Sequence, residues 1–204
     1  MFSRFRRWLE ARKQGRIDKR TARAADLSDT EEYDLVYLSK RRVIRARATG
    51  QSIAQVSAEI QNRIRRQLRV SIKPGTYFVA RGSYQNMATT THQQIVLPPC
   101  STRQVAMKAV CINADLPIPD TNARFSGVRA VSDELARFLE AAQRADPMTI
   151  QAGVWALTNH YSRSDVQEHL HIRDQLGNTR QAISDTHVME AKRILDGLGI
   201  KHRL

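Results

Sequence analysis

The sequence predicts an α+β fold: an antiparallel β-sandwich or partly open barrel, followed by a C-terminal helical cover and preceded by a basic helix. Apolar and polar residues alternate over much of residues 43–113, helix-starting residues recur after residue 132, and basic residues dominate the first 25 positions. Strands followed by helices are typical of this class. We therefore expect a basic helical N-terminal extension over 1–40, a β-sandwich over 41–125, and a helical part over 126–204 packed on the same domain.

The first 25 residues favour a helix, since Phe2, Phe5 and Leu9 follow helical spacing. Ser28 begins the run Ser-Asp-Thr-Glu, which matches a helix capping box in which serine and glutamate satisfy the first free backbone N–H groups. A second, short helix is therefore expected to begin at Ser28.

The middle of the chain reads as short strands. Arg45 and Arg47 alternate with apolar residues, and the same period of two returns in the stretches 55–61, 68–73 and 103–113. This period is typical of half-buried antiparallel strands. The isoleucine and valine residues in and around the stretch 55–61 also fit a helical spacing. Turn residues recur at short intervals, however, and this favours strands.

After the strands, four positions predict helix starts. Ser132, Asp146, Ser164 and Ser184 each precede a helical pattern, and their side chains can accept hydrogen bonds from the free N–H groups of a first turn. Proline directly after Asp146 suits the first helical position. We expect four helices in this part of the chain.

Composition excludes several classes. The 204 residues include 33 Lys or Arg, 20 Asp or Glu and only two cysteines, with a net charge of +13. No apolar run reaches the roughly 18 residues of a transmembrane helix, and two cysteines cannot build a disulfide-dense scaffold. No apolar stretch of a secretory signal follows the basic start. We therefore expect a cytoplasmic protein, or an extracellular one if a non-standard route exports it.

Two short motifs carry the candidate chemistry. One is Val110-Cys111-Ile112 at the end of a predicted strand, and the other is Ile150-Gln151-Ala152-Gly153-Val154-Trp155 near the start of the helix that Asp146 caps. Together they resemble the motifs of thioester domains from bacterial surface adhesins. That family has a cysteine between apolar residues and then a glutamine-containing helix with a tryptophan, although Gly153 stands where the family has alanine.

The resemblance implies an internal thioester. Cys111 would be the nucleophile, Gln151 the acyl donor, and an amine on a protein partner the later acceptor. We also name His160 as a residue that could polarise the carbonyl. Such a protein would be a non-enzymatic binding module without turnover. No paired carboxylates, catalytic triad, phosphate loop or metal-ligand cluster is apparent, so neither a cofactor nor a metal is expected.

A second function remains open, namely binding of nucleic acid or an anionic membrane surface through the basic N-terminal region. Residues 1–69 hold 18 basic and 8 acidic side chains, so most of the positive charge lies there. Basic clusters of this kind bind phosphate groups. The candidate residues are Arg4, Arg6, Arg7, Arg12, Lys13, Arg16, Lys19 and Arg20.

Overall fold

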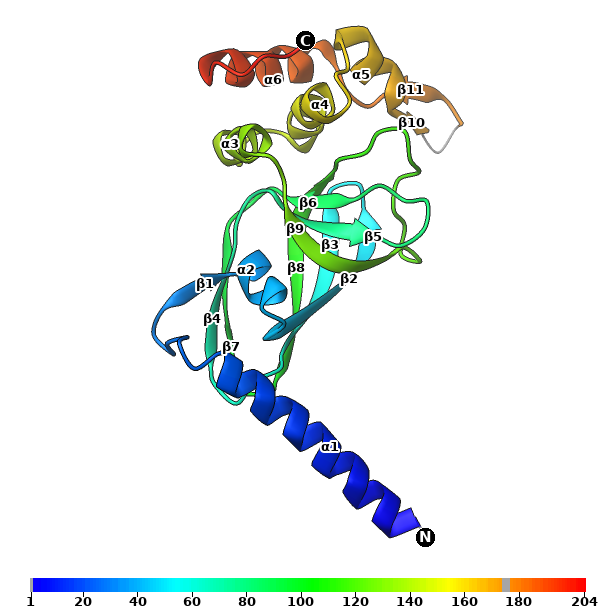
Figure 1. Ribbon diagram of the computed structural model, residues 1–204. Coiled ribbons are helices and arrows are strands. Elements are labelled where there is room, and N and C mark those ends of the chain that lie inside the picture. The colour runs from blue at the N-terminus through cyan, green and yellow to red at the C-terminus, as the bar shows by residue number, and fades with distance from the viewer. Residues whose placement is uncertain (1, 174–176) are drawn as a thin grey trace.

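The computed structural model describes residues 2–173 and 177–204, without the side chains of residues 2–4 and 173. Its centre is a closed antiparallel barrel (Figure 1). The strands follow one another around the barrel in the order β2 (Ile44–Ser52), β3 (Gln55–Asn62), β8 (Thr102–Cys111), β6 (Met87–Thr89), β5 (Thr76–Ala80) and β9 (Arg124–Ala130). The predicted α+β class is confirmed, and closure leaves none of these strands at a free edge.

Alternation in the sequence matches the two faces of the barrel wall. Ala46, Ala48, Val56 and Ile60 are buried along β2 and β3, while Arg45 and Arg47 face outward, as the period of two predicts. The β2–β3 pair confirms strands in the stretch where a helix was the alternative.

Beside the barrel lies a small second sheet in the order β1 (Glu32–Asp34), β4 (Leu68–Ile72) and β7 (Gln93–Leu97). The expected helix start at Ser28 is wrong. Residues 32–34 instead pair in parallel with β4, and Asp34 caps α2 (Leu35–Lys40) by accepting hydrogen bonds from two backbone N–H groups. Half of the expected N-terminal extension therefore belongs to the body of the domain.

Helices cover one end of the barrel (Figure 1). They are α3 (Asp133–Ala141), α4 (Pro147–Thr158), α5 (Arg163–His169) and α6 (Asp185–Gly197), with a hairpin of β10 (His171–Arg173) and β11 (Thr179–Gln181) between the last two. Ser132, Asp146 and Ser184 are N-caps as predicted. The third cap is Ser162 rather than Ser164, because Ser162 forms a full capping box with Asp165.

Strand β9 crosses the expected boundary at residue 125, and it closes the barrel by pairing with both β2 and β5. Only long-range pairing brings these strands together, so the boundary is not apparent from local patterns. The region after residue 126 thus supplies a barrel strand as well as the helical cover.

Helix α1 (Phe2–Arg23) projects from the opposite end of the barrel to the helical cover (Figure 1). Its last turns are attached to the body. The Arg65 backbone N–H donates to Thr21 Oγ1 at 3.1 Å, and the Arg66 guanidinium donates to the carbonyls of Ala25 and Leu27. Arg41 donates to the Arg23 carbonyl. These contacts determine the direction in which α1 leaves the domain.

Candidate functional site

The two motif residues, 40 positions apart, meet where β8 ends. Alternation along β8 puts the Cys111 side chain among the buried residues of the barrel core, and its exposed fraction is 0%. Asp146 and Pro147 start α4, which places Gln151 in its second turn with an exposed fraction of 1%. The structure therefore brings together Cys111 and Gln151.

Two hydrogen bonds join the Gln151 carboxamide to the backbone of Cys111. The Cys111 N–H donates to Gln151 Oε1 at 3.1 Å, and Gln151 Nε2 donates to the Cys111 carbonyl at 2.8 Å. On the side of β8 that faces β3, strand pairing stops at the β2–β3 turn, where the Ala109 N–H donates to the Ala54 carbonyl. Gln151 thus takes the place of the next strand residue and satisfies buried backbone groups that have no strand partner.

The same geometry has chemical consequences. A backbone N–H that donates to a carbonyl oxygen withdraws electron density and stabilises the oxyanion that forms when a nucleophile attacks the carbonyl carbon. Here the N–H belongs to the residue that carries the thiol. Burial raises the pKa of the Cys111 thiol to about 12, so little thiolate exists at neutral pH.

An aromatic cluster lies next to the pair. Trp155, one turn along α4 from Gln151, is fully buried and contacts the His169 ring edge-to-face at 4.8 Å between centroids. His169 Nε2 lies 2.6 Å from the Ala114 carbonyl. These groups fill the space around the end of β8 and exclude water from it.

His160 is not brought to the pair. It is exposed, lies just beyond the C-terminal end of α4 with φ +56°, and no described contact joins its ring to Cys111 or Gln151. Gln151 is near the other end of the same helix, about nine residues or roughly 13 Å away along the axis. The histidine that packs on Trp155 is His169 of α5.

A small pocket of about 170 Å³ lies beside the junction. Val110 and Ile150, the residues that precede Cys111 and Gln151, both line it, together with Ala54 from the β2–β3 turn and Lys108. Neither Cys111 nor Gln151 lines the pocket, so the pair itself is closed to solvent.

A larger cleft of about 790 Å³ separates α1 from the barrel. The lining includes Glu10 and seven cationic side chains, those of Arg12, Lys13, Arg16, Arg20, Arg45, Arg63 and Arg65. Four of the predicted basic residues therefore line it. Arg6, Arg7 and Lys19 are exposed elsewhere on the helix, and the Arg4 side chain lies outside the described residues. Arg63 and Arg65 were missed, since only the tertiary structure places them opposite α1.

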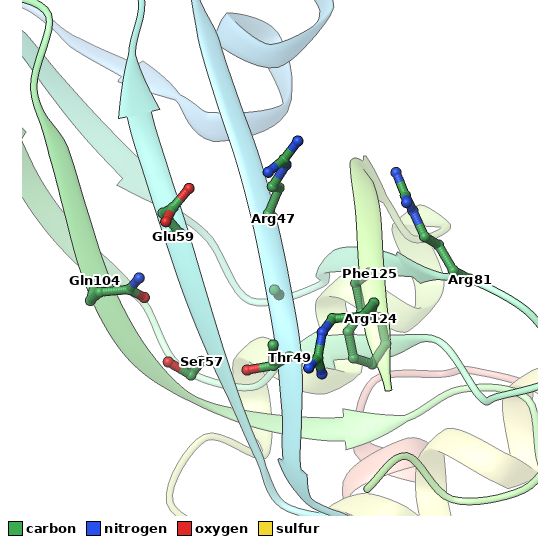
Figure 2. A pocket seen from close by; sticks show the side chains of 9 residues that line it. Arg47, Thr49, Ser57, Glu59, Arg81, Gln104, Arg124 and Phe125 are labelled. Carbon is green, nitrogen blue, oxygen red and sulfur yellow. The ribbon is translucent and has the colours of Figure 1, made fainter. Parts of the chain in front are cut away.

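A second polar pocket of about 390 Å³ lies on the outer wall of the barrel. Figure 2 shows Arg47 of β2, Arg124 of β9 and Arg81 around it, with Glu59 of β3 on one side. Thr49, Ser57 and Gln104 add neutral polar groups (Figure 2). This arrangement suits an anion with several oxygen atoms.

Comparisons with known proteins give no assignment: no family description, curated protein or solved structure matches the chain. Within residues 2–173 and 177–204, no cluster of three or more His, Cys, Asp or Glu side chains could hold a metal ion. Over the same ranges, no helix is long and apolar enough to cross a membrane.

Proposed function

We propose that the protein is a binding module in which Cys111 and Gln151 form an internal thioester that attaches the protein covalently to an amine-bearing partner. The observation that carries this proposal is the hydrogen bond from the Cys111 N–H to Gln151 Oε1 at 3.1 Å. It holds the carboxamide against the backbone of the residue whose thiol must attack it, and the attack needs the sulfur and the carboxamide carbon to come within about 3–3.5 Å of each other.

The reaction balances without a cofactor. The Cys111 sulfur attacks Gln151 Cδ and forms the C–S bond, the C–N bond breaks, and the nitrogen leaves as ammonia with the thiol proton. An amine of the partner later attacks the same carbon, so that a C–N bond forms and the C–S bond breaks. The sulfur takes a proton from the amine. The protein reacts once, because the acyl group of Gln151 stays with the partner.

Burial has two effects on this chemistry. It lowers the thiolate population, since it raises the pKa of the Cys111 thiol to about 12, and it therefore slows thioester formation. It also protects the product, because Trp155 and the residues of the barrel core exclude the water that would hydrolyse the bond. The pocket beside Val110 and Ile150 is lined by neither Cys111 nor Gln151, so the partner amine needs a local opening of the structure to reach the bond.

The intact mass of the purified protein is expected to be lower than the sequence mass by one ammonia. Methylamine treatment should raise this mass by one methylamine, because the amine opens the thioester. Cys111→Ala and Gln151→Ala should both have the full sequence mass, whereas Cys100→Ala, which removes the exposed cysteine, should keep the loss of ammonia. A wild-type mass equal to the sequence mass would overturn the proposal.

Thioester formation is expected to accelerate as the pH rises. Ammonia should open the bond and regenerate Gln151, so that re-formation can be followed by mass after the ammonia is removed. Because the thiol pKa is about 12, the thiolate fraction, and with it the rate, should rise about tenfold per unit over the pH range of roughly 7 to 9. A rate that does not change with pH would contradict attack by the thiolate.

A further inference from the structure

We propose that the cleft between α1 and the barrel, continued along β2 to the outer pocket, is a binding track for the phosphate backbone of a nucleic acid. This inference is independent of the thioester. It rests on three observations, namely the closeness of the two polar pockets along β2, the small number of ion pairs among the cations that line them, and the concave shape of the larger one.

The continuity comes from the alternation of β2. Arg45 lines the cleft, and Arg47, the next outward-facing residue on the same strand, lines the outer pocket. Two residues along a strand span about 7 Å, which is about two steps of 3.4 Å along one strand of a duplex. The two pockets therefore lie next to each other along the outer face of β2. Their cations outnumber the acidic lining residues Glu10 and Glu59, and together they suit an extended chain of phosphates better than a single small anion.

The cations in the cleft have few internal partners. Arg12, Arg16 and Arg20 follow one another four positions apart on α1, and like charges at this spacing repel each other. Among the described residues, one ion pair involves a cation of the cleft. It joins Arg65 to Asp18 at 3.8 Å, and both side chains are largely exposed. Such a pair contributes little to stability.

The charges on the barrel side add to this repulsion. Partial burial lowers the pKa of the Arg63 guanidinium, and the nearby Arg20, Arg45 and Arg42 lower it further. Burial also lowers the pKa of Arg20, with Arg16 as the second cause. A bound polyanion would relieve this repulsion between the arginines. Water and the ions of a dilute salt solution relieve it only weakly, so binding of a polyanion is favourable.

The shape favours a nucleic acid over a membrane. Arg20 and Arg63 are half-buried within the cleft, where a chain of phosphates can enter but a flat lipid surface cannot follow. Among the described side chains of α1, the exposed large apolar ones are Phe5, Trp8 and Leu9, all in its first half. A helix that lies in a membrane interface needs a longer apolar face.

The test measures binding of a short, fluorescently labelled DNA duplex, and of one of its single strands, to the full chain over a range of salt concentrations. The variant Arg45→Ala/Arg63→Ala removes two cations from the barrel side of the cleft. Its matched control is Arg144→Ala/Arg193→Ala, which removes two exposed arginines near the C-terminal helices, away from the track.

For the wild type, the logarithm of the affinity should fall steeply with the logarithm of the salt concentration. The slope should be about 0.9 per phosphate contact on a duplex and about 0.7 on a single strand. The cleft variant should lose at least about tenfold in affinity at low salt and flatten the duplex slope by about 1.8. The control should keep the slope and the affinity within about twofold.

Three results would overturn the proposal. The first is no binding to either DNA, and the second is an equal loss of affinity in the cleft variant and the control. The third is binding to anionic vesicles without binding to DNA, which would assign the surface to membranes. Circular dichroism checks that each variant is folded. If Arg45→Ala/Arg63→Ala does not fold, Arg12→Ala/Arg16→Ala tests the same cleft from the exposed helix, with the same expected loss.

Discussion

In the Cys111→Ala background, which cannot form a thioester and keeps the free carboxamide, Gln151→Ala is expected to lower the free energy of unfolding by about 2–6 kcal/mol. The substitution leaves the N–H and the carbonyl of Cys111 buried without their partner at the end of β8. Each buried backbone group that loses its hydrogen bond costs about 1–3 kcal/mol. Urea denaturation followed by circular dichroism measures the change.

Two controls separate the hydrogen bonds from other effects. Gln94→Ala removes an exposed glutamine side chain from β7 and should change the stability by no more than about 0.5 kcal/mol. Cys111→Ala cannot form a thioester and has both hydrogen bonds between the Gln151 carboxamide and the backbone, so it is the reference from which the effect of Gln151→Ala is measured. If Gln151→Ala is no more destabilising than Gln94→Ala, the carboxamide does not hold the end of β8.

Gly153→Ala is expected to destabilise the protein even though alanine is the better helix former. A Cβ atom at this position would lie 2.1 Å from Cζ of Phe138, whose ring from α3 packs against the glycine. Overpacking of this kind costs about 1–3 kcal/mol, whereas the helix preference returns about 1 kcal/mol. We expect a net loss, measured as a lower midpoint in thermal or urea unfolding.

The contact with Phe138 predicts a specific rescue. In the double variant Phe138→Leu/Gly153→Ala, the smaller side chain makes room for the new methyl group, so the two changes should destabilise less than the sum of the single effects. Gly15→Ala in α1, where nothing lies within 4 Å of the added atom, should instead stabilise its helix. Strict additivity in the double variant would show that the two residues do not clash.

Local signals in the sequence predicted much of the secondary structure. The caps Ser132, Asp146 and Ser184 are confirmed because capping depends on a hydrogen bond within one turn. Strand alternation is confirmed for the same reason, since it depends only on the pleat. At Ser28 the local pattern failed, because pairing of residues 32–34 with β4 stabilises this segment more than an isolated capping box would.

The two candidate sites differ in how far the sequence could predict them. The Gln151 carboxamide forms two hydrogen bonds with the backbone of Cys111, whereas the thioester that the motif resemblance implies stays a prediction. His160 was expected near them and is not there, because it follows the C-terminal end of α4, whereas Gln151 lies near the N-terminal end. For the cleft, the sequence showed that α1 is basic. It did not show that arginines of β2 and of the loop after β3 lie opposite this helix.

The sequence by itself determined the α+β class, the positions of most strands and helices, and the excess of positive charge near the N-terminus. These properties depend on residues within a few positions of each other. Only the tertiary structure decided that the barrel closes through β9, that the Gln151 carboxamide completes the edge of β8, and that α1 faces Arg45 and Arg63 across a cleft. Each of these features depends on contacts between segments that are distant in the sequence. Such contacts form because they accompany the burial of apolar surface in a common core.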